Sequence, residues 1–181
     1  ECLSRQIDFV ISNEQDLLNL MDEVQVDPAF VPFLKRAKSL GVPVTIVSDG
    51  FDLFIEQILK KNVQDPELLA SLPVFCNKLY WTGKGLKAIF ATHYCAHACA
   101  NCKPEAIRKS AAPNERIIFV GDGWSDRFAA EVSELTFAKG KLLAFCQEKS
   151  LPHLKYSSFK EIEDWLVTAH AGSGLSAGLV R

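Results

Sequence analysis

Residues 116–126 read RIIFVGDGWSD, an apolar run that ends in two carboxylates, Asp122 and Asp126, with a glycine on each side of the first. Consecutive large apolar residues are typical of a strand buried on both faces of a parallel sheet, and glycine allows a sharp turn where such a strand ends. Open α/β sheets bind ligands at that edge. Carboxylate oxygens suit Mg²⁺, so the stretch predicts a metal-binding corner, with an ordinary Asp-Gly turn as the alternative.

The composition is that of one globular unit: 181 residues, of which 48% are hydrophobic and 23% charged. A net charge of −2 gives no electrostatic reason to expect nucleic acid or an anionic membrane as a partner. No apolar stretch approaches the roughly 20 residues that cross a bilayer, and the first residues carry no signal-peptide pattern. We therefore expect a cytoplasmic protein without membrane contact. The sequence leaves the oligomeric state open.

Helices and strands are expected to alternate after an all-helical beginning. Strands are predicted over residues 42–47, 72–76, 117–120, 135–138 and 156–159, with a hairpin over 79–90. Helices are predicted from an Asp27 cap to Gly41 and over 51–62, 105–110, 125–133, 142–148 and 160–168. The alternation predicts an α/β fold with a mainly parallel sheet and right-handed crossovers. Residues 171–181, rich in Gly, Ser and Ala, are expected to form a flexible tail.

Two further polar features come before the opening stretch. Ser48, Asp49 and Gly50 follow the strand over 42–47, and a serine hydroxyl with successive backbone N–H groups can hold phosphate oxygens. Lys103 comes directly before a helix start, where its ammonium can reach the same edge of the sheet. Each feature alone is weak, since a turn and a solvated lysine are common. Their order along the chain, Ser, Lys and then GDGWSD, is far more specific.

In that order the chain resembles the haloacid-dehalogenase (HAD)-like hydrolases, in the branch that includes phosphoserine phosphatases. The resemblance covers roughly residues 28–168 and implies a Rossmann-like core and a Mg²⁺-dependent phosphatase that acts on a small phosphorylated metabolite. It implies that Ser48, Asp49, Gly50 and Lys103 bind the phosphoryl group, Lys103 and Asp122 being catalytic. It also implies that Asp122 binds Mg²⁺, with Asp126 as a ligand or in support. The cysteine-rich segment before Lys103 and the hairpin look most like the methionine-salvage phosphatases of that branch.

One motif of that family, Asp-x-Asp-x-Thr after the first strand, has no counterpart before Ser48. The resemblance implies that its first aspartate forms an aspartyl-phosphate, which water hydrolyses. Its strand would lie between the strands that end at Ser48 and Asp122, so its loss would leave two facing rows of unpaired backbone groups. We therefore expect residues 1–27 to be part of a helical cap, 28–170 to be the core, and an upstream segment to carry the motif.

These expectations have a consequence for activity: the 181-residue chain alone should be inactive, whereas the full-length protein should be an enzyme. The alternative is a noncatalytic module that binds phosphate or metal. The presence or absence of Asp-x-Asp-x-Thr upstream would distinguish the two.

Three cysteines lie within eight positions, Cys95, Cys99 and Cys102, with His93 and His97 among them. Thiolates and an imidazole at this spacing could hold a tetrahedral zinc ion. These ligands fit a zinc site better than an iron–sulfur cluster. The simpler interpretation is a loop of small, partly buried thiols with at most a labile disulfide.

Overall fold

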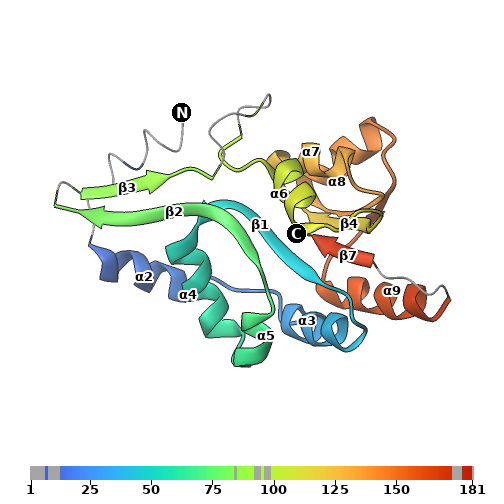
Figure 1. Cartoon of the computed structure of the whole chain (residues 1–181), viewed down its shortest axis with the longest axis horizontal. Helices are drawn as coiled ribbons and strands as arrows, with labels where there is room; N and C mark the ends of the chain where they lie inside the picture. Colours follow the sequence, from blue (N-terminus) through green and yellow to red (C-terminus); the bar gives the residue numbers. More distant parts are fainter. Residues whose placement is uncertain are drawn as a thin grey trace.

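A seven-stranded sheet organises the protein, and its strand order is β3-β2-β1-β7-β4-β5-β6 (Figure 1). The structure is a computed structural model that describes residues 7, 13–83, 85–91, 95, 99–172 and 177–180. The strands are β1 Val44–Phe51, β2 Val74–Thr82, β3 Gly85–Ile89, β4 Arg116–Gly121, β5 Leu135–Ala138, β6 His153–Lys155 and β7 Ala177–Val180. All neighbours pair in parallel except β2 and β3, which are antiparallel. The predicted α/β fold class is confirmed.

Helices cover both faces of this sheet (Figure 1). Their bounds are α2 Glu14–Asp22, α3 Phe30–Ser39, α4 Asp52–Asn62, α5 Pro66–Ala70, α6 Lys103–Ser110, α7 Arg127–Glu131, α8 Gly140–Glu148 and α9 Phe159–Gly172, with a 3₁₀ turn η1 at Trp124–Asp126. Helices α3 and α9 pack on one face, whereas α6, α7 and α8 cover the other. None of the helices in the described residues combines the length and hydrophobicity needed to cross a membrane.

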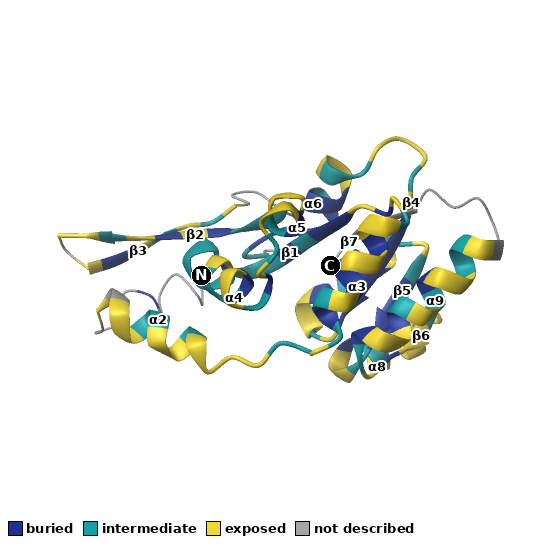
Figure 2. Ribbon diagram, turned by 90° about the horizontal axis from the view of Figure 1, so that it is seen from below, coloured by how far each residue is buried: buried dark blue, intermediate teal, exposed yellow. Residues whose placement is uncertain are grey.

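Two apolar layers form the core, one on each face of the sheet, and the alternation of strand side chains assigns residues to them. Val44, Ile118 and Val120 face the layer of α3 and α9. Ile117 and Phe119 face the layer of α6, α7 and α8. Figure 2 shows β4 and β5 largely in the buried colour, while the outer faces of the helices are exposed. The continuous apolar run of β4 is therefore explained by burial on both sides.

Several boundaries differ from the sequence predictions for identifiable reasons. Helix α3 begins at Phe30, with Ala29 in place of the predicted Asp27 as its N-cap. The Asp27 carboxylate accepts the N–H of Ala29 and also the N–H of Phe159 at the start of α9. Residues 72–76 and the first arm of the hairpin form one continuous strand, β2. The short helix α5, capped by the Asp65 side chain, was not predicted. The last predicted strand lies earlier, at His153–Lys155.

The centre of the sheet differs from the expectation of a flexible tail over 171–181. Helix α9 continues to Gly172, and Ala177–Val180 form strand β7, which lies between β1 and β4 and runs parallel to both. Without it, β1 and β4 would face each other with unpaired backbone N–H and C=O groups. The segment Ala177–Val180 satisfies part of that demand by pairing with both neighbours.

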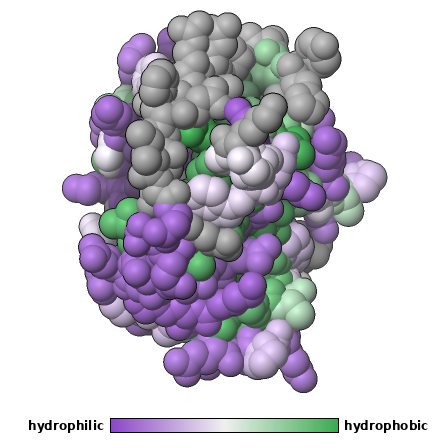
Figure 3. All heavy atoms as spheres, turned by 90° about the vertical axis from the view of Figure 1, so that its left-hand side faces the viewer, coloured by the Kyte–Doolittle hydropathy of each residue, from purple (hydrophilic) through white to green (hydrophobic). Residues whose placement is uncertain are grey.

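The β2–β3 hairpin extends from the sheet on the side of helix α2 (Figures 1 and 2). Its buried residues Leu79 and Leu86 pack with Phe51 at the end of β1. Figure 3 looks at this end of the molecule: hydrophilic residues cover most of the lower part of the face, and hydrophobic residues show in separate spots among them. The hairpin therefore belongs to a small hydrophobic cluster that is separate from the two main layers of the core.

Candidate functional site

Ser48, Asp49 and Gly50 lie inside the last part of β1 rather than in a turn after it. The pairing of β1 with β2 is irregular between Val47 and Phe51, as expected of a bulge, and bulges re-aim side chains near functional sites. The Gly50 N–H donates to Ser48 Oγ over 3.1 Å. Because this oxygen acts as the acceptor, the hydroxyl hydrogen of Ser48 remains able to donate to a ligand.

The β4–η1 turn is held by the Asp126 carboxylate. Its Oδ2 accepts the N–H of Asp122 over 3.0 Å and the N–H of Gly123 over 2.9 Å. This close approach requires glycine at position 121, because a Cβ there would lie 2.7 Å from Asp126 Oδ2 and 2.8 Å from a ring carbon of Phe119. Asp126 thus fixes the turn from a buried position.

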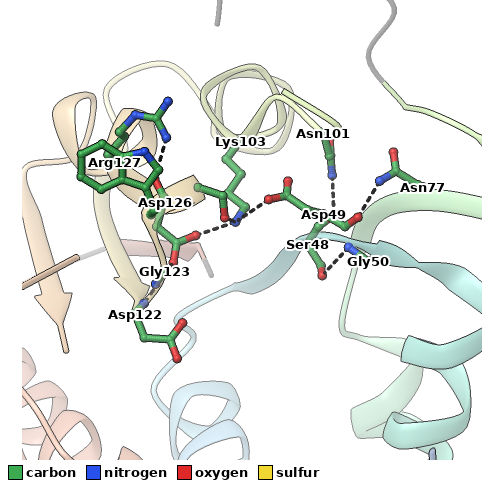
Figure 4. Close-up of polar contacts among 12 residues, drawn as sticks. Ser48, Asp49, Gly50, Asn77, Asn101, Lys103, Asp122, Gly123, Asp126 and Arg127 are labelled. Atoms are coloured by element: carbon green, nitrogen blue, oxygen red, sulfur yellow. Dashed lines mark hydrogen bonds and ion pairs between the residues drawn. The ribbon is translucent and has the colours of Figure 1, made fainter. Parts of the chain in front are cut away.

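Lys103 is the central cation of the site, and its side chain is only 8% exposed. Its Nζ lies 2.5 Å from Asp126 Oδ1, 3.0 Å from Ser125 Oγ and 3.5 Å from Asp49 Oδ2 (Figure 4). Two features of the chain explain this placement. Lys103 is the first residue of α6, and Asn101, two positions earlier, is hydrogen-bonded to the Ser48 carbonyl of β1. A buried ammonium between two carboxylates leaves little freedom to the lysine side chain.

The Asp122 carboxylate differs from those of Asp49 and Asp126, because it makes no hydrogen bond or ion pair to any residue that the structure describes. Mg²⁺ in phosphate-handling sites commonly takes one or two carboxylates, several waters and a phosphate oxygen. An uncommitted carboxylate beside a cationic lysine fits that donor set. No group of three or more His, Cys, Asp or Glu side chains in the described residues is arranged as a metal cage, so a metal here would rely on water and ligand oxygens as well.

All six residues that the sequence singled out for phosphate and Mg²⁺ line one cavity of about 270 Å³: Ser48, Asp49, Gly50, Lys103, Asp122 and Asp126. Val47, Val120, Gly121, Gly123 and Ser125 complete its lining. The hydroxyl, the ammonium and one free carboxylate therefore converge where β1 and β4 end. Such an arrangement can bind a phosphate group together with a divalent cation.

Sequence reasoning missed two buried asparagines that position β1. Asn101 Nδ2 donates to the carbonyl oxygens of Ser48 and Phe75, both over 2.9 Å. Asn77 Nδ2 donates to the carbonyl oxygen of Asp49 over 2.7 Å, and its Oδ1 accepts the N–H of Ala91. Asn101 stands two positions before Lys103, which is the one sequence signal that could have drawn attention to it.

Asn101→Leu is expected to lower the free energy of unfolding by about 1–3 kcal/mol, because the carbonyl groups of Ser48 and Phe75 lose a donor in a buried place. It should also weaken phosphate binding, because Lys103 and Ser48 are no longer held together. Urea denaturation and a phosphate titration measure the two effects. Asn19→Leu, at an exposed position of α2, is the control. Unchanged stability and phosphate affinity in Asn101→Leu would contradict this positioning role.

The three cysteines of the predicted cluster, Cys95, Cys99 and Cys102, are among the described residues. Burial, together with a hydrogen bond between the Cys99 and Cys95 thiols, raises the pKa of Cys99 to about 12, and burial also raises the pKa of Cys102. All three sulfurs are free of disulfides. No described group of ligands could hold a metal ion, so the zinc expectation is not supported; His93 and His97 lie outside the described residues. The cluster lies beside α6 without lining the cavity.

Comparisons with known proteins place the chain in a family. A family model described as haloacid dehalogenase-like hydrolase matches residues 12–131. A curated 2-hydroxy-3-keto-5-methylthiopentenyl-1-phosphate phosphatase from an Exiguobacterium species is 26% identical over 171 residues, covering 92% of this chain and 76% of that protein. The protein of the same name from Bacillus velezensis is 29% identical over 170 residues, with 86% and 70% of the two chains covered.

A solved structure is also similar in fold. The crystal structure of phosphoserine phosphatase from T. onnurineus in complex with NDSB-201 superposes with a TM-score of 0.63 at 16% sequence identity. The match covers 90% of this chain and 70% of that chain. At this identity the likeness concerns the fold alone.

Proposed function

Because the chain belongs to the haloacid dehalogenase-like hydrolase family, in its phosphatase branch, we propose that its cavity hydrolyses the phosphate ester of a small metabolite with Mg²⁺ as cofactor. The observation that carries this proposal is the place of the Lys103 ammonium, which lies between the bulged end of β1 and the turn after β4. A phosphate that enters there meets a cation, a hydroxyl and an uncommitted carboxylate in one cavity.

Each residue has a proposed role that follows from its contacts. Ser48 donates its hydroxyl to a phosphoryl oxygen, and the backbone around Asp49 and Gly50 shapes the place for the phosphate. Lys103 neutralises phosphate charge. Asp122 would bind Mg²⁺ directly, while Asp126 supports it by fixing the turn. Bound Mg²⁺ would supply further neutralisation of the charge on the phosphoryl oxygens.

An aspartyl-phosphate intermediate needs a carboxylate that is free to attack phosphorus. Asp49 and Asp126 are both paired with Lys103, and Asp122 is the proposed metal ligand. We therefore propose that the nucleophile is an aspartate other than these three, and we expect the 181-residue chain to bind phosphate without turning it over.

For the substrate we propose a small phosphomonoester of the kind named for the relatives, a 2-hydroxy-3-keto-5-methylthiopentenyl 1-phosphate or a compound like it. A cavity of about 270 Å³ has room for a phosphate group and a few further atoms. Phosphoserine is the competing substrate to include.

The test is a phosphate-release screen with small phosphomonoesters, run on the complete gene product beside the 181-residue chain. We expect release by the complete product that requires Mg²⁺ and is fastest with the methylthio ketose phosphate. Phosphate binding without release from any ester would contradict the enzyme and identify a phosphate-binding module. That second possibility is favoured only by the commitment of Asp49 and Asp126 to Lys103.

A further inference from the structure

A second cavity, of about 220 Å³, lies at the edge of the sheet where β1 begins. Val44 at the start of β1 lines this cavity, whereas Ser48 and Gly50 near the end of β1 line the phosphate cavity. Helices α3 and α5, which contact each other, flank it (Figure 1). We call it the apolar cavity, because most of its lining is apolar: Leu34, Val42, Pro43, Val44, Leu68 and Leu72.

The walls of the apolar cavity belong to the hydrophobic core, yet they do not fill the space between them. Leu34 of α3, Val44 of β1 and Leu68 of α5 are buried members of the layer that contains α3 and α9. Protein interiors are close-packed, so side chains around a gap of this size lack contacts that a bound apolar group would supply. An apolar cavity of about 150 Å³ already holds benzene. The apolar cavity therefore has room for a chain of about six carbon atoms.

The rim of the apolar cavity carries one charged side chain, that of Lys38. Its Nζ lies 3.9 Å from Glu67 Oε2 on α5, beyond hydrogen-bond distance, and the Glu67 side chain is 91% exposed. The Asp65 carboxylate also lies in the field of Lys38, but it caps α5 by accepting the N–H groups of Glu67 and Leu68. The Lys38 ammonium thus makes no hydrogen bond to the described residues, and its three hydrogens are available to an anionic ligand.

The second polar side chain of the lining offers no hydrogen to a ligand. Ser71 Oγ donates to the carbonyl oxygen of Leu68 over 2.7 Å. Lys38 is therefore the one side chain of the lining that can donate to an anion. A single cation beside apolar walls matches a molecule with one negative charge at the end of an apolar chain, whereas a phosphate ester would bring two charges to one lysine.

We propose that the apolar cavity binds a small carboxylic acid as its anion, with a chain of about five carbon atoms in the cavity and the carboxylate on the Lys38 ammonium. This site goes beyond the proposed function and does not depend on it, because the two cavities share no lining residue. The ligand replaces the loose pair of Lys38 and Glu67 by a charged hydrogen bond and covers apolar surface that the core leaves open.

The test is a titration of the full 181-residue chain with sodium hexanoate, followed by the amide signals in nitrogen–proton NMR spectra. We expect the signals of Val44 and Leu72 to shift, and those of Gly50 and Gly121 in the phosphate cavity to stay. Affinity should rise about fourfold per methylene from butanoate to hexanoate, since each added CH₂ is buried. Hexylammonium should bind at least about tenfold more weakly than hexanoate. Equal affinity for these two ions would overturn the proposal.

Lys38→Met removes the ammonium but keeps an apolar side chain of similar length. It should weaken the binding of hexanoate by about tenfold and leave that of hexan-1-ol unchanged, because a charged hydrogen bond is lost. Lys35→Met is the matched control, since Lys35 is exposed on the same helix and does not line the cavity. Equal affinity of hexanoate for Lys38→Met and the unchanged chain would contradict the site.

A competition experiment distinguishes the apolar cavity from the phosphate cavity, where a carboxylate could bind to Lys103. At constant ionic strength, saturating inorganic phosphate should leave the affinity for hexanoate unchanged. Competition by phosphate, or signal shifts at Gly50 and Gly121 in place of Val44, would overturn the proposal. None of these measurements uses turnover, so failure here is distinct from failure of the proposed phosphatase activity.

Discussion

Asp122→Asn is expected to abolish Mg²⁺ binding at the site and to lower phosphate release by the proposed phosphatase by at least about a hundredfold. The reason is that Asp122 carries the one cavity carboxylate without a partner among the described residues, so its charge is available to a cation. The amide removes that charge while keeping the size of the side chain. Isothermal titration with Mg²⁺ measures binding, and a phosphate-release assay measures turnover.

The same substitution should hardly change stability, because the backbone N–H of Asp122, and not its carboxylate, takes part in the turn. Asp164→Asn is the matched control, since that carboxylate is 64% exposed on α9 and remote from the cavity. Full Mg²⁺ affinity in Asp122→Asn would refute the assignment of Asp122 as the metal ligand.

Lys103→Met is expected to lower the free energy of unfolding by about 3–5 kcal/mol, because it leaves the buried Asp126 carboxylate without its cation. It should also weaken phosphate binding by about a hundredfold, since a charged hydrogen-bond donor is lost. Urea denaturation followed by circular dichroism gives the first quantity. Titration with inorganic phosphate gives the second.

A double variant separates the two roles of the lysine. Lys103→Met combined with Asp126→Asn removes both charges, while the amide oxygen at position 126 can still accept the N–H groups of Asp122 and Gly123. We expect most of the lost stability to return and phosphate affinity to stay low. Recovery of phosphate affinity in the double variant would show that Lys103 acts only by stabilising the fold.

The parts of the fold that depend on local pattern could be predicted from the sequence. β4 was predicted because four large apolar residues between a charged residue and a glycine are typical of a buried strand. β5 was also predicted, with the bounds that the structure has. The end of β1 was not predictable in this way, because Ser48-Asp49-Gly50 is typical of a turn. Its carbonyl groups accept hydrogen bonds from Asn101 and Asn77, which are far away in the chain.

The contacts that build the site were harder to predict from the sequence, because they join residues far apart in the chain. The order of Ser48, Lys103 and Asp122 predicted their meeting, since the carboxyl ends of parallel strands share one edge. Nothing local shows that Asn101 donates to the carbonyl oxygen of Ser48, or that the Asp126 carboxylate is paired with Lys103 and holds the turn. The strand at 177–180 was missed because its sequence favours no structure, and its order comes from its two neighbours.

The central claim is that one cavity holds phosphate and Mg²⁺ together. The most direct test is a titration of inorganic phosphate into the 181-residue chain with and without Mg²⁺, together with the reciprocal Mg²⁺ titration. We predict that each ligand tightens the binding of the other by the same factor, at least about tenfold. The reason is that the bound cation attracts the phosphate in the same cavity, and such coupling between two ligands is reciprocal. Phosphate binding that is independent of Mg²⁺, or that Lys103→Met leaves unchanged, would contradict the account.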